Sequence, residues 1–236
     1  GSSDTQTGRR LTVATSPDFP PFESLDGTNI VGIEKDLMDQ IAAKMGVEIE
    51  YVQIDFDSVL NGVEAGKYDI GMSGISVTDE RKENALFTDP YCLAAQAIVV
   101  TEGSSIASKA DLTGKTISVQ TGSTAELFCQ GEGYAVSSFQ ANSDAESALV
   151  TGKVDAWVID DLTAAEMVSA YNADNGETLV ILNEAMTTEP YAFAFAFGSE
   201  DLVEAINEII KDMLADGTIA EIFVKYDAPY TAPGNN

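Results

Sequence analysis

Apolar residues recur along this chain with two periods, and each change of period marks an element that we predict. Leu11 to Thr15 form a short apolar run typical of a strand. The run leads into a loop from Ser16 to Phe22 that three prolines stiffen. From Glu34 to Met45 the apolar positions return every three or four residues, which predicts a helix, and Gly46 follows as its stop. Residues 47–51 then alternate apolar and acidic, the period of a half-buried strand.

The same order of elements appears twice. A helix over about 58–65, a Gly66-Lys67 turn and a strand over 69–72 resemble residues 149–158, where Gly152-Lys153 is the turn. The strand 116–120, which enters the loop 121–124, parallels the opening strand and its loop. Strand, helix, strand order predicts largely parallel sheets, so we expect an α/β fold with two similar lobes. A strand over 191–195 and an amphipathic helix over 201–214 complete the predicted elements.

Loops at the carboxyl ends of the strands are where open α/β sheets bind ligands. The rule selects residues 16–22 and 73–81 in the first lobe. It selects residues 121–124 and 160–161 in the second. If the lobes face each other, we expect these four loops to converge on one cleft.

Composition excludes several classes of function. Of the 236 residues, 44% are hydrophobic, enough for a sizeable core, and the net charge of -27 disfavours nucleic acid and anionic membranes as partners. Histidine is absent, which argues against most zinc sites and most nucleophile-base pairs. Cys92 and Cys129 have no metal or redox spacing. We therefore expect no metal, no cofactor and no enzymatic activity, and we find no apolar run long enough to span a bilayer.

Arg81 is the first candidate for ligand chemistry. It follows Thr78, a predicted N-cap, where a strand end meets a helix. A guanidinium grips a carboxylate with two parallel hydrogen bonds, so an arginine beside a cleft suits a carboxylate ligand. The alternative is a solvated arginine at a helix start.

The second lobe offers a complementary pair of features. The loop Thr121-Gly122-Ser123-Thr124 precedes a helical stretch and offers backbone N–H groups and hydroxyls to an anion, although an ordinary N-cap has the same pattern. Asp160 ends the strand that begins at Ala156, and its carboxylate suits an ammonium group, although a helix cap is the alternative. With Arg81, these features predict a site for a zwitterion.

Aromatic residues accompany the first-lobe loops. Phe19, Phe22 and Phe56 are able to sandwich the aliphatic part of a ligand or to pack in the core. We expect Phe22 to shape its loop and choose Phe19 and Phe56 for the cleft.

The chain resembles the polar amino-acid-binding proteins of bacterial ABC importers, extracellular solute-binding proteins of family 3. Seven segments in the family's order carry the resemblance between Leu11 and about Asp227: Ser16–Phe22, Val31–Leu37, Ser73–Arg81, Phe87–Tyr91, Gly122–Thr124, Val154–Asp160 and Glu189–Tyr191. The family has the two-lobed type II periplasmic-binding-protein fold with a two-segment hinge. The resemblance places the hinge near residues 94–96 and 189–192.

The resemblance also implies roles for individual residues. Arg81 holds the ligand carboxylate with help from Thr124 and the region of Ser123. Asp160 holds the amino group, and the Gly74 carbonyl and the Ser76 hydroxyl assist it.

The side-chain pocket is less specified. The resemblance implies that Phe19 and Phe56 flank the ligand side chain. Gln120, Ser16 and Ser73 suit a neutral polar group, so we favour a glutamine-like ligand. Asp18 and Asp161 keep a cationic ligand, arginine or lysine, as the alternative.

These patterns predict the following organisation. Residues 1–9 form a flexible leader that begins with an added Gly-Ser-Ser remnant, residues 10–95 plus 191–228 form lobe 1, residues 96–190 form lobe 2, and residues 229–236 form a flexible tail. The protein is expected to be a monomer outside the cytoplasm, periplasmic or lipid-anchored at the outer face of the cell membrane, with ABC permease subunits as partners. Two other classes remain: a dehydratase-type enzyme that uses Glu189 or Asp160 as its acid, and the ligand-sensing domain of a receptor.

Overall fold

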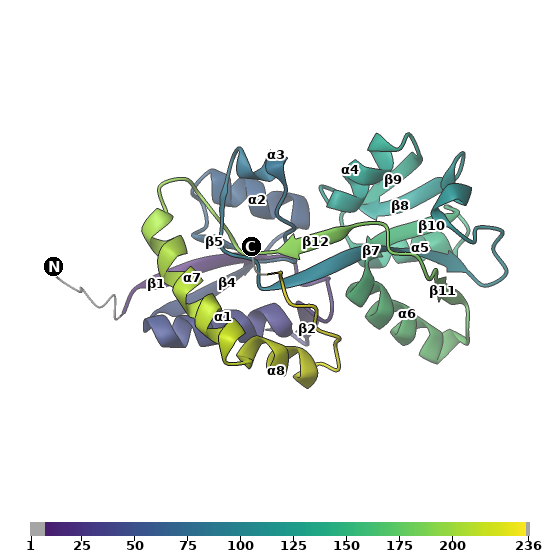
Figure 1. The fold of residues 1–236 in the computed structure, drawn as a ribbon. Helices are drawn as coiled ribbons and strands as arrows, with labels where there is room; N and C mark the ends of the chain where they lie inside the picture. The colour runs from purple at the N-terminus through teal and green to yellow at the C-terminus, as the bar shows by residue number, and fades with distance from the viewer. Residues whose placement is uncertain (1–7, 235–236) are drawn as a thin grey trace. The chain divides into compact units, whose positions relative to one another are not determined.

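The computed structural model describes residues 8–234, which form two compact units (Figure 1). Unit 1 holds the described residues up to Pro17, then Phe22–Leu93 and the chain from Pro190 onward. Unit 2 holds Asp18–Pro21 and Ala94–Glu189. Residues 1–7 of the predicted leader and residues 235–236 of the predicted tail lie outside the described residues.

Unit 1 is built on a five-stranded sheet. The strand β1 (Arg10–Thr15) pairs in parallel with the edge strand β4 (Glu48–Gln53) on one side and with the central strand β5 (Ile70–Gly71) on the other. Beyond β5 the sheet continues through β13 (Ala194–Phe195) and β6 (Leu86–Phe87), and β13 is antiparallel to both neighbours. A hairpin of β2 (Ser24–Asp26) and β3 (Asn29–Val31) lies outside this sheet.

Helices cover the unit 1 sheet and bury its apolar residues. The helices α1 (Ile33–Met45), α7 (Glu200–Ala215) and α8 (Thr218–Lys225) pack against one another, as Figure 1 shows. The helix α2 (Phe56–Glu64) packs against β1, β5 and β13, and the short α3 spans Asp79–Lys82. The predicted face of α1 is confirmed, because Leu37 and Ile41 are buried and Gly46 ends the helix with a left-handed φ of 69°.

Unit 2 is built on a mixed sheet in the order β11 (Leu179–Ile181), β7 (Cys92–Thr101), β10 (Ala156–Asp160), β8 (Thr116–Gln120) and β9 (Ala135–Phe139). The strand β12 (Thr188–Tyr191) also pairs with β7. The helices of this unit are α4 (Thr124–Gly131), α5 (Asn142–Val150), α6 (Asp161–Asn175) and a short 3-10 helix at Lys109–Leu112. One apolar cluster of its core joins α4 and the 3-10 helix to the strands β7, β8 and β10, and it includes Ile98, Ile117 and Val158.

Two details of the sheets differ from the prediction. The strand pairs β1–β4, β1–β5, β8–β9 and β8–β10 are parallel, but β7 and β13 run against their neighbours, so both sheets are mixed. The predicted strand over 191–195 is divided into β12 and β13. The direction of a strand and the points where it is interrupted depend on which other strands pair with it. The periodicity of a single segment carries no information on its pairing partners.

The predicted internal repeat has a structural basis that is the same in each unit. In unit 1, the Asp69 carboxylate accepts a hydrogen bond of 2.8 Å from the Thr12 N–H, and the Asp69 N–H donates to the Thr12 carbonyl at 3.1 Å. In unit 2, Asp155 and Thr116 exchange the same two bonds, both at 2.8 Å. Each aspartate therefore ties the start of a returning strand to the start of the neighbouring strand.

At Gly32 both the backbone conformation and the nearby backbone atoms exclude a side chain. Gly32 precedes α1 with φ at 136°, and a Cβ built there would lie 2.2 Å from the Phe22 carbonyl oxygen. That oxygen accepts the Glu34 N–H at 3.0 Å, so the close approach satisfies a backbone donor in the first turn of the helix. A side chain at this position would break the contact as well as strain the backbone.

We expect Gly32→Ala to lower the free energy of unfolding by roughly 3–5 kcal/mol, because a clash with backbone atoms adds to an unfavourable φ. Gly27→Ala is the matched control, since Gly27 also has a positive φ, 64°, but has nothing within 4 Å of a built Cβ. Its cost should be about 1 kcal/mol. Urea unfolding of both variants checks the difference, and equal costs would contradict the role of the Phe22 contact.

Candidate functional site

In unit 1, the carboxyl ends of two neighbouring strands bring Ser16 and Ser73 together. Ser16 follows β1 and Ser73 lies just beyond β5, and these strands are parallel. The Ser16 N–H donates to the Ser73 Oγ at 3.0 Å, and the Ser73 hydroxyl donates to the Glu23 Oε1 at 3.0 Å. Gly74 follows with φ at 55° and donates its N–H to the Glu34 Oε2 at 2.9 Å. Hydrogen bonds to the carboxyl groups of Glu23 and Glu34 thus fix the segment Ser73–Gly74 of the loop predicted to bind ligand.

Arg81, Ser76 and Phe56 also come together in unit 1. Arg81 lies on α3, which Thr78 caps by accepting the Arg81 N–H at 3.1 Å, as predicted. The Arg81 Nη1 donates to the Ser76 carbonyl at 2.8 Å, and the guanidinium carbon is 6.0 Å from the centre of the Phe56 ring. One edge of the guanidinium is therefore oriented by protein, and its face is close enough to an aromatic ring for a cation–π contact.

In unit 2, the start of α4 forms the predicted anion-binding loop. The Ser123 hydroxyl accepts the Glu126 N–H at 3.1 Å and donates to the Gln120 carbonyl at 2.7 Å. Ser123 is thus an N-cap, and its contribution to an anion site is to orient the helix. The Thr121 N–H donates to the Phe139 carbonyl at 2.8 Å, which ties the loop to β9. The first-turn N–H groups of Thr124 and Ala125 have no acceptor within the helix, as at any helix start.

Gln120 is buried with 7% exposure, and its Nε2 donates to the Gln140 carbonyl at 3.2 Å. The side chain is therefore held within unit 2 at the end of β8.

Thr124 belongs to a buried polar cluster that we did not predict. Its hydroxyl donates to the Glu189 Oε2 at 2.7 Å and accepts from the Gln96 Nε2 at 3.0 Å. The same Nε2 donates to the Glu189 Oε1 at 2.8 Å, and the Thr187 hydroxyl donates to that oxygen at 3.0 Å. Gln96 is fully buried, and its Oε1 has no hydrogen-bond partner among the described residues. Among the described residues, this oxygen is thus a buried acceptor that receives no hydrogen bond.

Asp160 and Phe19, the remaining predicted site residues, both belong to unit 2. Asp160 is the last residue of β10 and is 8% exposed. Phe19 is equally buried, in the segment Asp18–Pro21. Asp18, which kept a cationic ligand possible, accepts the Asn142 N–H, and its carbonyl accepts from the Asn142 side chain at 2.8 Å. Burial raises the pKa of the Asp18 carboxyl above its usual value.

Several residues of these networks have signals that sequence reasoning overlooked. Glu34 occupies the same helical face as Leu37, Met38 and Ile41, and an acid on an apolar face is a candidate for burial. Glu23 and Gln96 have no comparable pattern, because neither lies in a segment with a clear polar and apolar side. Asn142 is the first residue of α5, and no sequence pattern there indicates its bonds to Asp18.

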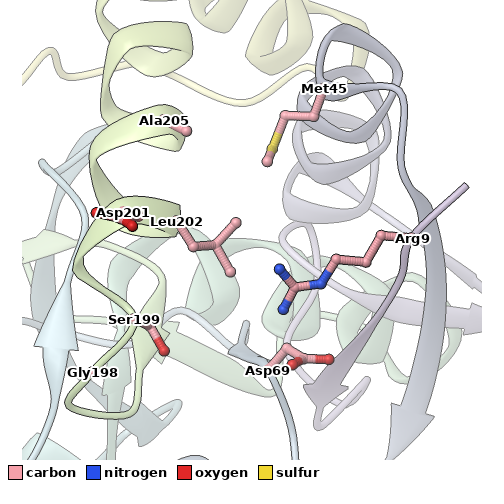
Figure 2. A pocket seen from close by; sticks show the side chains of 8 residues that line it. All are labelled: Arg9, Met45, Asp69, Gly198, Ser199, Asp201, Leu202 and Ala205. Carbon is pink, nitrogen blue, oxygen red and sulfur yellow. The ribbon is translucent and has the colours of Figure 1, made fainter. Parts of the chain in front are cut away.

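A pocket of about 500 Å³ in unit 1 lies away from these residues (Figure 2). Arg9, which precedes β1, points into it, and Asp69, which precedes β5, lines it together with the start of α7. These are the amino ends of the strands, whereas Ser16 and Ser73 follow the carboxyl ends. A six-residue strand is about 20 Å long, so the pocket and the predicted ligand loops lie at opposite ends of the strands, about that far apart.

The chain belongs to the bacterial extracellular solute-binding proteins, family 3, because that family's model matches residues 11–228. A probable histidine-binding protein of Campylobacter jejuni is 32% identical over 231 residues, which cover 96% of this chain and 88% of that protein. Among the solved structures, two ancestral arginine-binding proteins are each 38% identical to this chain. An ancestral arginine-binding protein bound to arginine covers 92% of this chain and 97% of its own, with a TM-score of 0.84, and one bound to glutamine covers 93% and 98%, with a TM-score of 0.85.

These similarities confirm the predicted family and the α/β, type II periplasmic-binding-protein fold. All three proteins are named for binding rather than for a reaction. Within residues 8–234, no helix combines the length and the apolar character that crossing a membrane requires. The described residues also contain no cluster of histidine, cysteine and acidic side chains suited to a metal ion.

We expect Thr124→Val to lower the free energy of unfolding by about 1–3 kcal/mol, because it deprives the buried Glu189 and Gln96 of a hydroxyl partner at nearly constant volume. Thr124→Ser, which keeps the hydroxyl, should cost less than about 1 kcal/mol. Chemical denaturation in the absence of ligand measures both. A valine variant as stable as the serine variant would show that the cluster does not need this hydroxyl.

Proposed function

We propose that this protein captures a free α-amino acid outside the cytoplasm and delivers it to the permease of an ABC importer. The single observation that carries the proposal is the setting of Arg81. Its guanidinium is oriented by the Ser76 carbonyl and lies near the Phe56 ring, in the segment that follows the carboxyl end of β5. An oriented guanidinium is suited to a carboxylate, the group that every free amino acid carries.

The chemistry of unit 2 complements this anchor. In our proposal the first-turn N–H groups of α4 give a second contact to the ligand carboxylate, and the buried Asp160 receives the ammonium group. Membership of a solute-binding family supports reversible capture of a ligand that shifts the protein between conformational states. Binding and release then require no bond to be made or broken.

The ligand side chain is the finer part of the proposal. The unpartnered Gln96 Oε1 is buried beside the Glu189 carboxylate, so unit 2 offers acceptors at this point. A side chain with N–H donors matches them, and glutamine and arginine both qualify. The relatives bound to these two amino acids support the same pair of candidates. Glutamine needs only the amide acceptor, whereas arginine would also use the charge of Glu189.

Arg81→Ala should weaken amino-acid binding by about 2–5 kcal/mol, the range for removing one partner of a buried charge pair. Arg10→Ala is the matched control, because it removes the same charge from a side chain that is 63% exposed and pairs with Glu48 on the surface. Calorimetry with the best ligand from a thermal-shift screen of the twenty amino acids measures both variants. Unchanged affinity in Arg81→Ala, or silence of the whole screen, would refute the proposed anchor.

Glu189→Gln separates the two side-chain candidates. The substitution removes a negative charge but keeps two polar atoms in place, so we expect arginine affinity to fall about tenfold or more and glutamine affinity to change less. Titration of both amino acids into the parent and the variant gives the comparison. Equal losses for the two ligands would mean that Glu189 supports the site without contacting a ligand cation.

The same titrations address the enzymatic alternative. Prolonged incubation of the protein with its ligand, followed by chromatography, should return the amino acid unaltered. Formation of a product would replace the binding proposal by a catalytic one.

A further inference from the structure

Unit 1 contains two glutamates side by side without access to solvent. Glu23 follows Phe22 and precedes β2, and Glu34 is the second residue of α1. Both have 0% exposure. None of the salt bridges among residues 8–234 includes either of them. Two buried carboxylates without a cation are strongly disfavoured, because each loses its hydration and each repels the other.

The hydrogen bonds around the pair show where a proton fits. Glu34 is the acceptor at both of its oxygens, from the Gly74 N–H at 2.9 Å and from the Tyr91 hydroxyl. Glu23 accepts the Ser73 hydroxyl at its Oε1, whereas its Oε2 is buried and receives no donor. An oxygen without a donor, next to a carboxylate that accepts, is the natural place for the proton.

We propose that Glu23 and Glu34 share one proton at neutral pH, and that this singly charged pair positions the ligand-binding segment Ser73–Gly74. Ser73 is bound to one member of the pair and Gly74 to the other, so the separation of the two carboxyl groups sets the course of the backbone between them. Ser73 also fixes the Ser16 N–H, which extends the support to the loop after β1. The ligand aspect of this role rests on the function proposed above, while the shared proton does not.

The directions of the pKa shifts around the pair agree with this assignment. Burial first, and then repulsion by Glu34, raises the pKa of Glu23 well above its usual value. Burial also raises the pKa of Tyr91, which keeps its hydroxyl a donor. The buried thiol of Cys92 also raises the pKa of this phenol. None of these groups brings a positive charge to the pair.

The sign of the pH dependence follows from the raised pKa. The stabilisation by protonated Glu23 is complete below the pKa of an unfolded-state glutamate and is lost as pH rises through the higher pKa of the folded state. Above that value a second charge would push the two carboxyl groups apart and loosen the segment Ser73–Gly74.

Infrared spectroscopy of the ligand-free protein at neutral pH tests the shared proton. The C=O stretch of a protonated carboxyl is distinct from the bands of ionised carboxylates, and we expect the parent protein to show it. Glu23→Gln should remove the band, because the amide replaces the protonated acid and still donates to Glu34. Glu64→Gln, at the exposed end of α2, is the control and should leave the band unchanged. Absence of the band in the parent, or its persistence in Glu23→Gln, would overturn the proposal.

Hydrogen exchange tests the positioning role. In Glu34→Gln we expect the peptide that contains Gly74 to exchange at least tenfold faster than in the parent, whereas Glu64→Gln should not change it. Equal exchange in Glu34→Gln and the parent would overturn this role. Both readouts use ligand-free protein, so a chain that binds no amino acid would refute the proposed function and leave the pair confirmed. A chain that binds amino acids but shows no protonated carboxyl would give the reverse result.

Discussion

A carboxyl group that loses contact with water needs donors or a proton, and this requirement shapes the loops of both units. In unit 1, Glu23 and Glu34 are buried beneath Ser73 and Gly74 and hold that segment through its hydroxyl and its backbone N–H. In unit 2, Glu189 receives bonds from the amide of Gln96 and from two threonine hydroxyls. The groups that donate these hydrogen bonds are hydroxyls, a side-chain amide and a backbone N–H, all of them neutral.

Several side chains predicted to contact a ligand are bound instead to other parts of the protein. The side chains of Ser123 and Thr124 are occupied by the protein, the first as a helix cap and the second in the cluster with Glu189. What the start of α4 offers to an anion is therefore its backbone, which any sequence with the same cap would supply. In the function proposed above, recognition of the ligand side chain therefore depends on other groups, among them the buried Gln96 Oε1.

One fold serves several ligands among the relatives of this chain. The probable histidine-binding protein is 32% identical to it, and the two ancestral arginine-binding proteins, one bound to arginine and one to glutamine, are 38% identical. In the function proposed above, contacts to the common part of an amino acid come from strand ends and a helix start, which the fold preserves. A few side chains in the interior are enough to change which side chain is accepted, because a buried polar group without its partner is costly.

The sequence by itself determined the α/β class, the family, the main helices and the repeated turn at Gly66 and Gly152, because periodicity, glycine stops and ordered motifs are local properties. It also placed Thr78 as the cap of the short helix that carries Arg81. Only the tertiary structure decided that β7 and β13 run antiparallel and that Glu23 meets Glu34 and Gln96 meets Glu189. These pairs are 11 and 93 positions apart in the sequence, and no local pattern specifies a partner across such a separation. Strand direction and buried polar pairing are settled by packing, which acts only once distant segments have come together.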